Sequence, residues 1–260
     1  MNARTGAVRP MTITPIIGIG EVPAGAPLAS LIVAGLIEAG LSVQPGDIVV
    51  VTSKIVSKAE NRFARLADVV VSAQAADLAA TTRKDERLVE LVLTQSSDVV
   101  RAVQHVLITR HQLGLVMANA GIDQSNLGPG EPDRVLLLPE DPDESASALR
   151  DEIQALVGTA PAVVIADSFG RPWRNGVVAV AIGASGLPAL LDRRGERDRE
   201  GRVLEVTQVA LADMIASAAG LVMGEGAEGV PVALVRGFSA AGEDCPAASL
   251  VRPVEQDLFR

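Results

Sequence analysis

Short aliphatic runs that alternate with helical patterns are the feature of this sequence that most limits its possible folds. Runs typical of strands occupy residues 48–51, 162–166, 177–182 and 230–235, and residues 109–118 contain another. This alternation predicts a fold that mixes helices and strands. Hydrophobic residues make up 48% of the chain but aromatic residues only 2%, so the core must consist of aliphatic side chains buried between helices and sheet.

Three segments of the chain have the periodicity of helices. The clearest is expected to begin at the N-cap Asp141, with Pro142 in its first turn, and to end at Gly158. The others cover about residues 84–95 and 207–222.

The charge balance excludes several classes of protein. Lys and Arg number 23 and Asp and Glu 32, and this net charge of −9 disfavours nucleic-acid binding. The most apolar stretch, residues 27–41, is shorter than the about 20 apolar residues that span a membrane, and predicts a buried helix. The N-terminal residues lack the apolar part of a signal peptide, and the single cysteine, Cys245, excludes an internal disulfide. We therefore expect a cytoplasmic protein that binds neither nucleic acid nor membrane.

Two aspartates follow apolar runs in the same way. Asp167 directly follows residues 162–166 and precedes Ser168, and Asp123 comes shortly after the run that ends at residue 118. Proteins with α/β folds place ligand-binding groups at the carboxyl ends of strands, and these oxygen atoms suit Mg²⁺ or Mn²⁺. Each aspartate alone also fits an ordinary turn, but the recurrence of the pattern gives a metal site equal weight.

Two further segments have chemistry suited to phosphate. Ser53, Lys54 and Lys58 follow the strand at residues 48–51, although this segment lacks the glycine-rich signature of a P-loop. Residues 223–230 contain three glycines, which let backbone N–H groups approach a ligand closely. The end of a helix followed by a flexible turn would explain the same glycines.

Residues 169–176 contain two arginines near Asp167. Arg171 and Arg174 flank the only tryptophan, Trp173, in what the glycines predict to be a loop. Two guanidinium groups can hold a phosphate or a carboxylate through paired hydrogen bonds. The alternative is a solvated loop that Trp173 anchors in the core.

Together these segments resemble the coenzyme F420-0:L-glutamate ligases, the F420 γ-glutamyl ligase family. The resemblance runs from about residue 13 to residue 260, and its most specific motifs are AGID-SN and DSxGR. The segments that carry it are residues 15–22, 46–60, 119–126, 138–143, 167–171 and 223–226.

The resemblance implies a reaction and its cofactors. GTP and two divalent cations, Mg²⁺ or Mn²⁺, would join L-glutamate to the lactyl carboxylate of F420-0 through an acyl phosphate. A second, γ-linked glutamate would follow, with GDP and phosphate as by-products. The resemblance also implies a homodimer, and K⁺ is an additional candidate ion.

The resemblance also assigns roles to individual residues. The expected metal ligands are Asp123, Asp167, Ser168 and Glu225, and the expected catalytic residues are Asp123, Asp167 and Lys58. The expected nucleotide site comprises Ile19, Gly20, Glu21, Val22, Ser53, Lys54, Lys58, Asn126, Met223, Gly224, Glu225, Gly226, Ala227, Glu228, Gly229 and Val230. From their position alone, Arg171 and Arg174 are hypothesised to contact F420-0 or glutamate.

A shared nucleotide site constrains the fold. If residues near 20, 55, 125 and 225 contact one GTP, the two ends of the chain must pack together. We therefore predict an α+β fold of two interleaved lobes, with residues 1–105 and 205–260 binding nucleotide and residues 106–204 binding metal and substrate. Two alternatives stay open: an ATP-grasp-like carboxylate–amine ligase that acts on another acid, and a nucleotide sensor without turnover.

Overall fold

A five-stranded mixed sheet forms the centre of the molecule. The computed structural model describes residues 10–128, 133–239 and 241–257. The strands lie in the order β1, β12, β2, β8, β9, and their bounds are Thr12–Ile16, Val232–Arg236, Ile48–Thr52, Ala162–Arg171 and Arg174–Ser185. Strands β2 and β8 run parallel, and the other neighbours run antiparallel. The predicted α+β class is confirmed.

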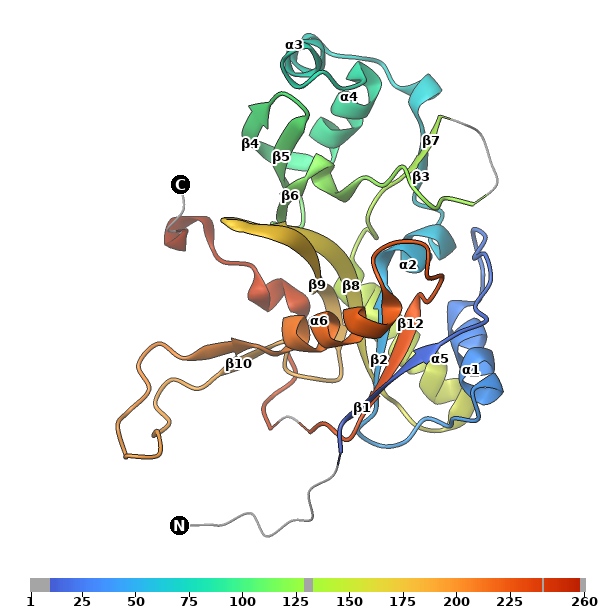
Figure 1. Ribbon diagram of the computed structural model, residues 1–260, viewed down its shortest axis with the longest axis vertical. Coiled ribbons are helices and arrows are strands. Elements are labelled where there is room, and N and C mark those ends of the chain that lie inside the picture. Colours follow the sequence, from blue (N-terminus) through green and yellow to red (C-terminus); the bar gives the residue numbers. More distant parts are fainter. Residues whose placement is uncertain (1–9, 129–132, 240, 258–260) are drawn as a thin grey trace.

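Helices cover both faces of this sheet (Figure 1). Helices α1 (Leu28–Glu38) and α5 (Pro142–Val157) pack on one face, and α6 (Leu211–Met223) packs on the other. Successive residues of β2 alternate between the two cores: Val49 and Val51 face α1 and α5, while Ile48 and Val50 face α6. The strand is therefore buried on both sides, which explains its continuous aliphatic run.

The predicted signals at the ends of α5 are confirmed. The Asp141 side chain accepts a hydrogen bond from the Glu144 backbone N–H at 3.0 Å, and Pro142 occupies the first turn. Gly158 ends the helix in the left-handed conformation, with φ of 78°.

A smaller body with its own core is inserted between α2 (Ser53–Ala59) and α5 (Figure 1). Helices α3 and α4 pack against a three-stranded sheet of β4, β5 and β6, and the β3–β7 pair lies where the chain enters and leaves. The helices are α3 (Ala73–Thr82) and α4 (Glu86–Thr94). The strands are β3 (Phe63–Arg65), β4 (Ser96–Val103), β5 (Val106–His111), β6 (Val116–Ala118) and β7 (Arg134–Leu136).

The chain divides at other positions than the expected lobes. The predicted second lobe, residues 106–204, does not follow the strand pairing, because β8 and β9 belong to the central sheet. The inserted body instead spans about residues 63–136. The expected and observed divisions differ because β8 pairs parallel with β2, and the sequence of either strand alone does not reveal this pairing.

Several element boundaries also differ from the prediction. Residues 109–118 contain parts of two strands, β5 and β6, which pair antiparallel. Strand β8 continues past Asp167, so residues 169–176 form the end of a β-hairpin and not a loop. Trp173 is 80% exposed at its tip and does not anchor it in the core. The helix expected from residue 207 begins at Leu211, because β11 precedes it.

A long arm leaves the main body between β10 (Leu190–Asp192) and β11 (Gln208–Ala210), as Figure 1 shows. The densely charged segment 193–202 lies in this arm. Across the ranges that the structure describes, none of the helices has both the length and the apolar character needed to cross a lipid bilayer.

Candidate active site

A cavity of about 920 Å³ lies at the carboxyl end of β2. Its lining comes from parts of the chain around residues 20, 55, 120, 168 and 226. All of the residues expected to bind nucleotide or metal line this one cavity. Arg171 and Arg174 are absent from its described lining. The structure therefore brings together segments whose proximity the sequence could only suggest.

Asp167 lies on β8, beside the start of α2. Ser53 is the first residue of α2, and its hydroxyl donates a hydrogen bond to Asp167 Oδ1 at 2.7 Å. Burial raises the pKa of Asp167 to about 6, and the nearby Asp123 carboxylate adds to the rise, while the hydrogen bond from Ser53 opposes it. Asp167 is therefore a carboxylate whose negative charge is incompletely compensated by the protein.

Asp123 follows a strained piece of backbone. Asn119, Ala120 and Gly121 all have left-handed conformations, with φ of 51°, 50° and 70°. Such conformations are costly for residues other than glycine and often occur at functional sites. The Asp123 backbone is then fixed by two hydrogen bonds with Leu136, each of 2.9 Å. The position of Asp123 is thus set by the inserted body on both sides.

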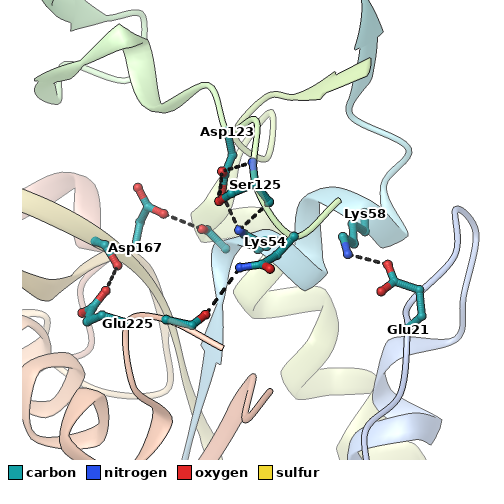
Figure 2. A network of polar contacts seen from close by, with 11 residues as sticks. Glu21, Lys54, Lys58, Asp123, Ser125, Asp167 and Glu225 are labelled. Carbon is teal, nitrogen blue, oxygen red and sulfur yellow. Dashed lines mark hydrogen bonds and ion pairs between the residues drawn. The ribbon is translucent and has the colours of Figure 1, made fainter. Parts of the chain in front are cut away.

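The Asp123 carboxylate is held by two partners (Figure 2). Oδ1 accepts hydrogen bonds from the Ser125 N–H at 3.0 Å and from its hydroxyl at 2.9 Å. Oδ2 lies 2.6 Å from Lys54 Nζ, which also donates to the Ser125 carbonyl at 2.9 Å. Burial opposes ionisation, but the hydrogen bonds from Lys54 and Ser125 and the charge of Lys54 keep the pKa of Asp123 below its ordinary value.

A second lysine lies deeper in the same wall. Lys58 Nζ pairs with Glu21 Oε1 at 2.5 Å, and the Lys58 side chain is only 5% exposed. Figure 2 shows this pair on one side of Lys54, with Asp167 and Glu225 on the other. A buried ammonium group beside a large cavity is suited to hold an anion such as a phosphate.

The turn after α6 closes the remaining wall of the cavity. Gly224 ends the helix with φ of 78°, and the Ser168 hydroxyl hydrogen-bonds to the Glu225 carboxylate. The Asn126 amide donates to the Gly226 carbonyl at 3.4 Å. These contacts join the turn at residues 223–230 to both the β8 strand and the inserted body.

Two signals of this site were available in the sequence but missed. The whole chain has only three lysines, Lys54, Lys58 and Lys84, and two of them line the cavity. Ser125 holds both Asp123 and Lys54, and its two-residue spacing from Asp123 is typical of a local side chain to backbone hydrogen bond.

The expected metal ligands are gathered but not preorganised. Among the described residues, no three acidic, histidine or cysteine side chains are already arranged to hold a metal ion. Asp123 is paired with Lys54, and Glu225 with Ser168. The donors still fit a hard divalent cation, because all of them are oxygens and because Asp167 lacks a full counter-charge.

Arg171 and Arg174 lie opposite each other at the end of the β8–β9 hairpin. The preceding pair of this hairpin, Gly170 and Val177, lines the cavity, while the two arginines are not among its lining residues. Arg171 Nη2 donates to the Asn175 carbonyl at 3.4 Å, and its Nε is buried without a hydrogen-bond partner.

Comparison with known proteins establishes the family. The family model of F420-0:Gamma-glutamyl ligase matches residues 16–237. This chain belongs to that family. Among curated relatives of this ligase, the coenzyme F420:L-glutamate ligase of Methanothermobacter thermautotrophicus is 43% identical over 250 residues, which cover 94% of this chain and 98% of the relative. The protein of the same name from Methanopyrus kandleri is 45% identical, and the match covers 87% of this chain and 90% of the relative. The one from Archaeoglobus fulgidus is 40% identical, and the match covers 95% of this chain and 96% of the relative.

The resemblance of the sequence motifs to this family is thus confirmed, and this chain is an enzyme of the ligase class. The matched residues 16–237 include every segment that lines the cavity. The cavity is therefore the candidate active site.

Proposed function

We propose that this ligase uses GTP to join L-glutamate to coenzyme F420-0 and then adds a further, γ-linked glutamate, releasing GDP and phosphate. The observation that carries the proposal is the convergence of Lys54, Lys58, Asp123 and Asp167 from distant segments on one cavity. Its volume of about 920 Å³ falls in the range of small-molecule sites. The names of the relatives, coenzyme F420:L-glutamate ligase, support the choice of substrates.

The chemistry requires activation of a carboxylate. A carboxylate is a poor acylating agent, so an oxygen of the F420-0 lactyl carboxylate first attacks the γ-phosphorus of GTP, and the bond to GDP breaks. The glutamate amine then attacks the carbonyl carbon of the acyl phosphate, the bond to phosphate breaks, and the nitrogen loses a proton. The protein's main task is to position these groups and to balance their charge.

Individual residues fit these tasks. Lys58 and the backbone N–H groups of residues 223–230 would hold the phosphate oxygens. Asp123, Asp167, Ser168 and Glu225 would hold two divalent cations, Mg²⁺ or Mn²⁺, which when bound neutralise charge on the transferred phosphoryl group. A homodimer and a K⁺ requirement belong to the same proposal by resemblance to the family.

Mass spectrometry tests the reaction. The protein is incubated with GTP, Mn²⁺, F420-0 and L-glutamate, and we expect products heavier than F420-0 by one and then two glutamyl units. Parallel reactions with ATP, or with simple carboxylic acids in place of F420-0, test for a ligase of another acid. Binding of GTP without phosphate release or product, when all substrates are supplied, would contradict the proposal and indicate a nucleotide sensor.

The hairpin arginines provide a prediction about the acceptors. We expect Arg174→Gln to raise the KM for F420-0 or for glutamate about tenfold, because a charge-assisted hydrogen bond contributes roughly 1.5–3 kcal/mol. Arg194→Gln, in the distant β10–β11 arm, is the matched control and should leave both constants unchanged. Steady-state kinetics with each acceptor varied in turn measures the effect. Unchanged constants for both acceptors in Arg174→Gln would remove Arg174 from the substrate site.

A further inference from the structure

We infer that Lys54 competes with the divalent cation for Asp123, so that this lysine couples metal binding to nucleotide binding. The inference rests on the proposed function for the identity of the metal and the nucleotide. It goes beyond that function because it assigns Lys54 a role against metal binding as well as a role in holding phosphate.

The competition follows from the contacts of the Asp123 carboxylate. Its Oδ1 accepts two hydrogen bonds from Ser125, and its Oδ2 lies 2.6 Å from Lys54 Nζ. Both oxygens therefore already have partners. A divalent cation at Oδ2 would lie next to an ammonium group bound to the same oxygen, and like charges this close repel strongly. Asp123 can serve as a full metal ligand only after Lys54 has left Oδ2.

Lys54 is the partner that can move. The Ser125 N–H that contacts Asp123 belongs to the backbone, and its departure would open the turn that holds Asp123. The Lys54 side chain, in contrast, has a flexible stem and is 25% exposed in the cavity. Its ammonium group faces the same cavity that would contain the nucleotide phosphates, so phosphate oxygens offer it an alternative set of acceptors.

Lys58 provides a comparison within the same cavity. It carries the same charge but pairs with Glu21, which is not among the expected metal ligands. Glu21 is half exposed and can turn toward solvent when Lys58 takes up a phosphate. Of the two lysines that line the cavity, Lys54 is therefore the one that occupies an oxygen a metal would need, and it is the one expected to oppose metal binding directly.

Mutual dependence of the two ligands is the consequence. If phosphate draws Lys54 away from Asp123, a bound nucleotide raises the affinity for the metal, and the metal raises the affinity for the nucleotide by the same factor. Loss of the Lys54 charge should therefore strengthen the binding of metal alone. Loss of a residue that helps to bind the metal would instead weaken metal binding.

Titration of the 260-residue protein with Mn²⁺ alone tests the inference. Free Mn²⁺ is measured by electron paramagnetic resonance for the wild type, Lys54→Met, Lys54→Arg and Lys58→Met. We expect Lys54→Met to bind Mn²⁺ about tenfold more tightly than the wild type. Lys54→Arg keeps the charge and should resemble the wild type, and Lys58→Met, which removes the same charge elsewhere in the cavity, should differ from it by less than about twofold.

A second measurement follows the coupling. Calorimetric titration with GDP, with and without Mn²⁺, should show at least about a tenfold gain in GDP affinity from Mn²⁺ in the wild type and a clearly smaller gain in Lys54→Met. Should Lys54→Met fold poorly, Lys54→Gln removes the same charge and carries the same expectation.

The outcomes separate this inference from the proposed reaction. Equal or weaker Mn²⁺ binding in Lys54→Met and Lys54→Gln overturns the inference, even if γ-glutamyl products form. So does an equal gain in Lys58→Met, which would indicate a general charge effect. Tighter Mn²⁺ binding in Lys54→Met and Lys54→Gln, without a similar gain in Lys54→Arg or Lys58→Met, supports the inference, even if mass spectrometry shows no glutamylated F420-0.

Discussion

Asp167→Asn is expected to lower the rate of product formation about a thousandfold while making the metal-free protein more stable. The loss of rate follows from the removal of a carboxylate that would bind the metal, since metal ions contribute several kcal/mol of charge stabilisation to such reactions. The gain in stability is expected in the protein without metal, where no cation balances the Asp167 carboxylate. There the Asp167 charge is partly buried beside Asp123 and is not fully balanced.

The pH dependence of folding stability shows why Asp167→Asn should stabilise the metal-free protein. Burial raises the pKa of Asp167 to about 6 from an ordinary value of 3.8. The stability associated with Asp167 is therefore fully present below pH 3.8 and is lost as the pH rises through about 6. A difference of about two pKa units corresponds to about 3 kcal/mol at most at pH 7, and Asp167→Asn should recover part of it.

Asp123→Asn is the matched comparison. The pKa of Asp123 is lowered, because hydrogen bonds and the charge of Lys54 outweigh its burial. Its contribution to stability is present above the ordinary pKa and is lost as the pH falls. Asp123→Asn should therefore lose both activity and stability at pH 7, in contrast to Asp167→Asn.

Thermal unfolding of the three proteins with a chelator at pH 5 and pH 7, together with mass-spectrometric rates, measures these effects. The advantage of Asp167→Asn over the wild type should be larger at pH 7 than at pH 5. A lower melting temperature for Asp167→Asn than for the wild type at pH 7, or retention of more than about a tenth of the activity, would contradict this account.

Gly183→Ala is expected to be the most destabilising of the small substitutions in the central sheet. A Cβ atom at this position of β9 would lie 2.1 Å from the Pro142 carbonyl oxygen at the start of α5. This neighbour is backbone and cannot rotate away. The Asp143 carboxylate also accepts the Ala184 N–H at 2.8 Å, so strand and helix are joined at this point.

We expect Gly183→Ala to cost about 3 kcal/mol, which is the upper part of the usual range for overpacking. For a chain of this size the melting temperature should fall by roughly 6–12 °C. Gly170→Ala, on the neighbouring strand β8, is the control, because a Cβ there has no other atom within 4 Å. Its stability should stay within about 0.5 kcal/mol of the wild type. Equal melting temperatures for the two variants would show that α5 can shift away from β9.

Local features of the fold could be predicted well from the sequence. The aliphatic run of β2, the N-cap Asp141 and the C-terminal Gly158 of α5 each depend on neighbours in sequence, and the structure has them as expected. The division into lobes depends instead on which distant strands pair. Nothing in the β8 sequence indicates that it lies parallel to β2, so the boundary of the inserted body was misplaced.

At the candidate site, too, local motifs could be predicted from the sequence but long-range contacts could not. The motifs around Asp123, Asp167 and Glu225 identified the segments that line the cavity. Their side-chain contacts could not be predicted, because the Lys54–Asp123 pair joins residues from α2 and the inserted body that lie far apart in sequence. The hairpin arginines were expected in a loop, since the glycines at 170 and 176 gave no sign that β8 continues past Asp167.

We propose that Asp123 and Asp167, from distant segments of the chain, bind metal together beneath the nucleotide. A crystal structure of the protein with Mn²⁺ and GDP, with manganese located by anomalous scattering, tests it most directly. We expect manganese within about 2 Å of an oxygen of each carboxylate, with Lys54 Nζ moved away from Asp123 Oδ2. Manganese bound elsewhere, with Asp123 still paired to Lys54, would contradict it.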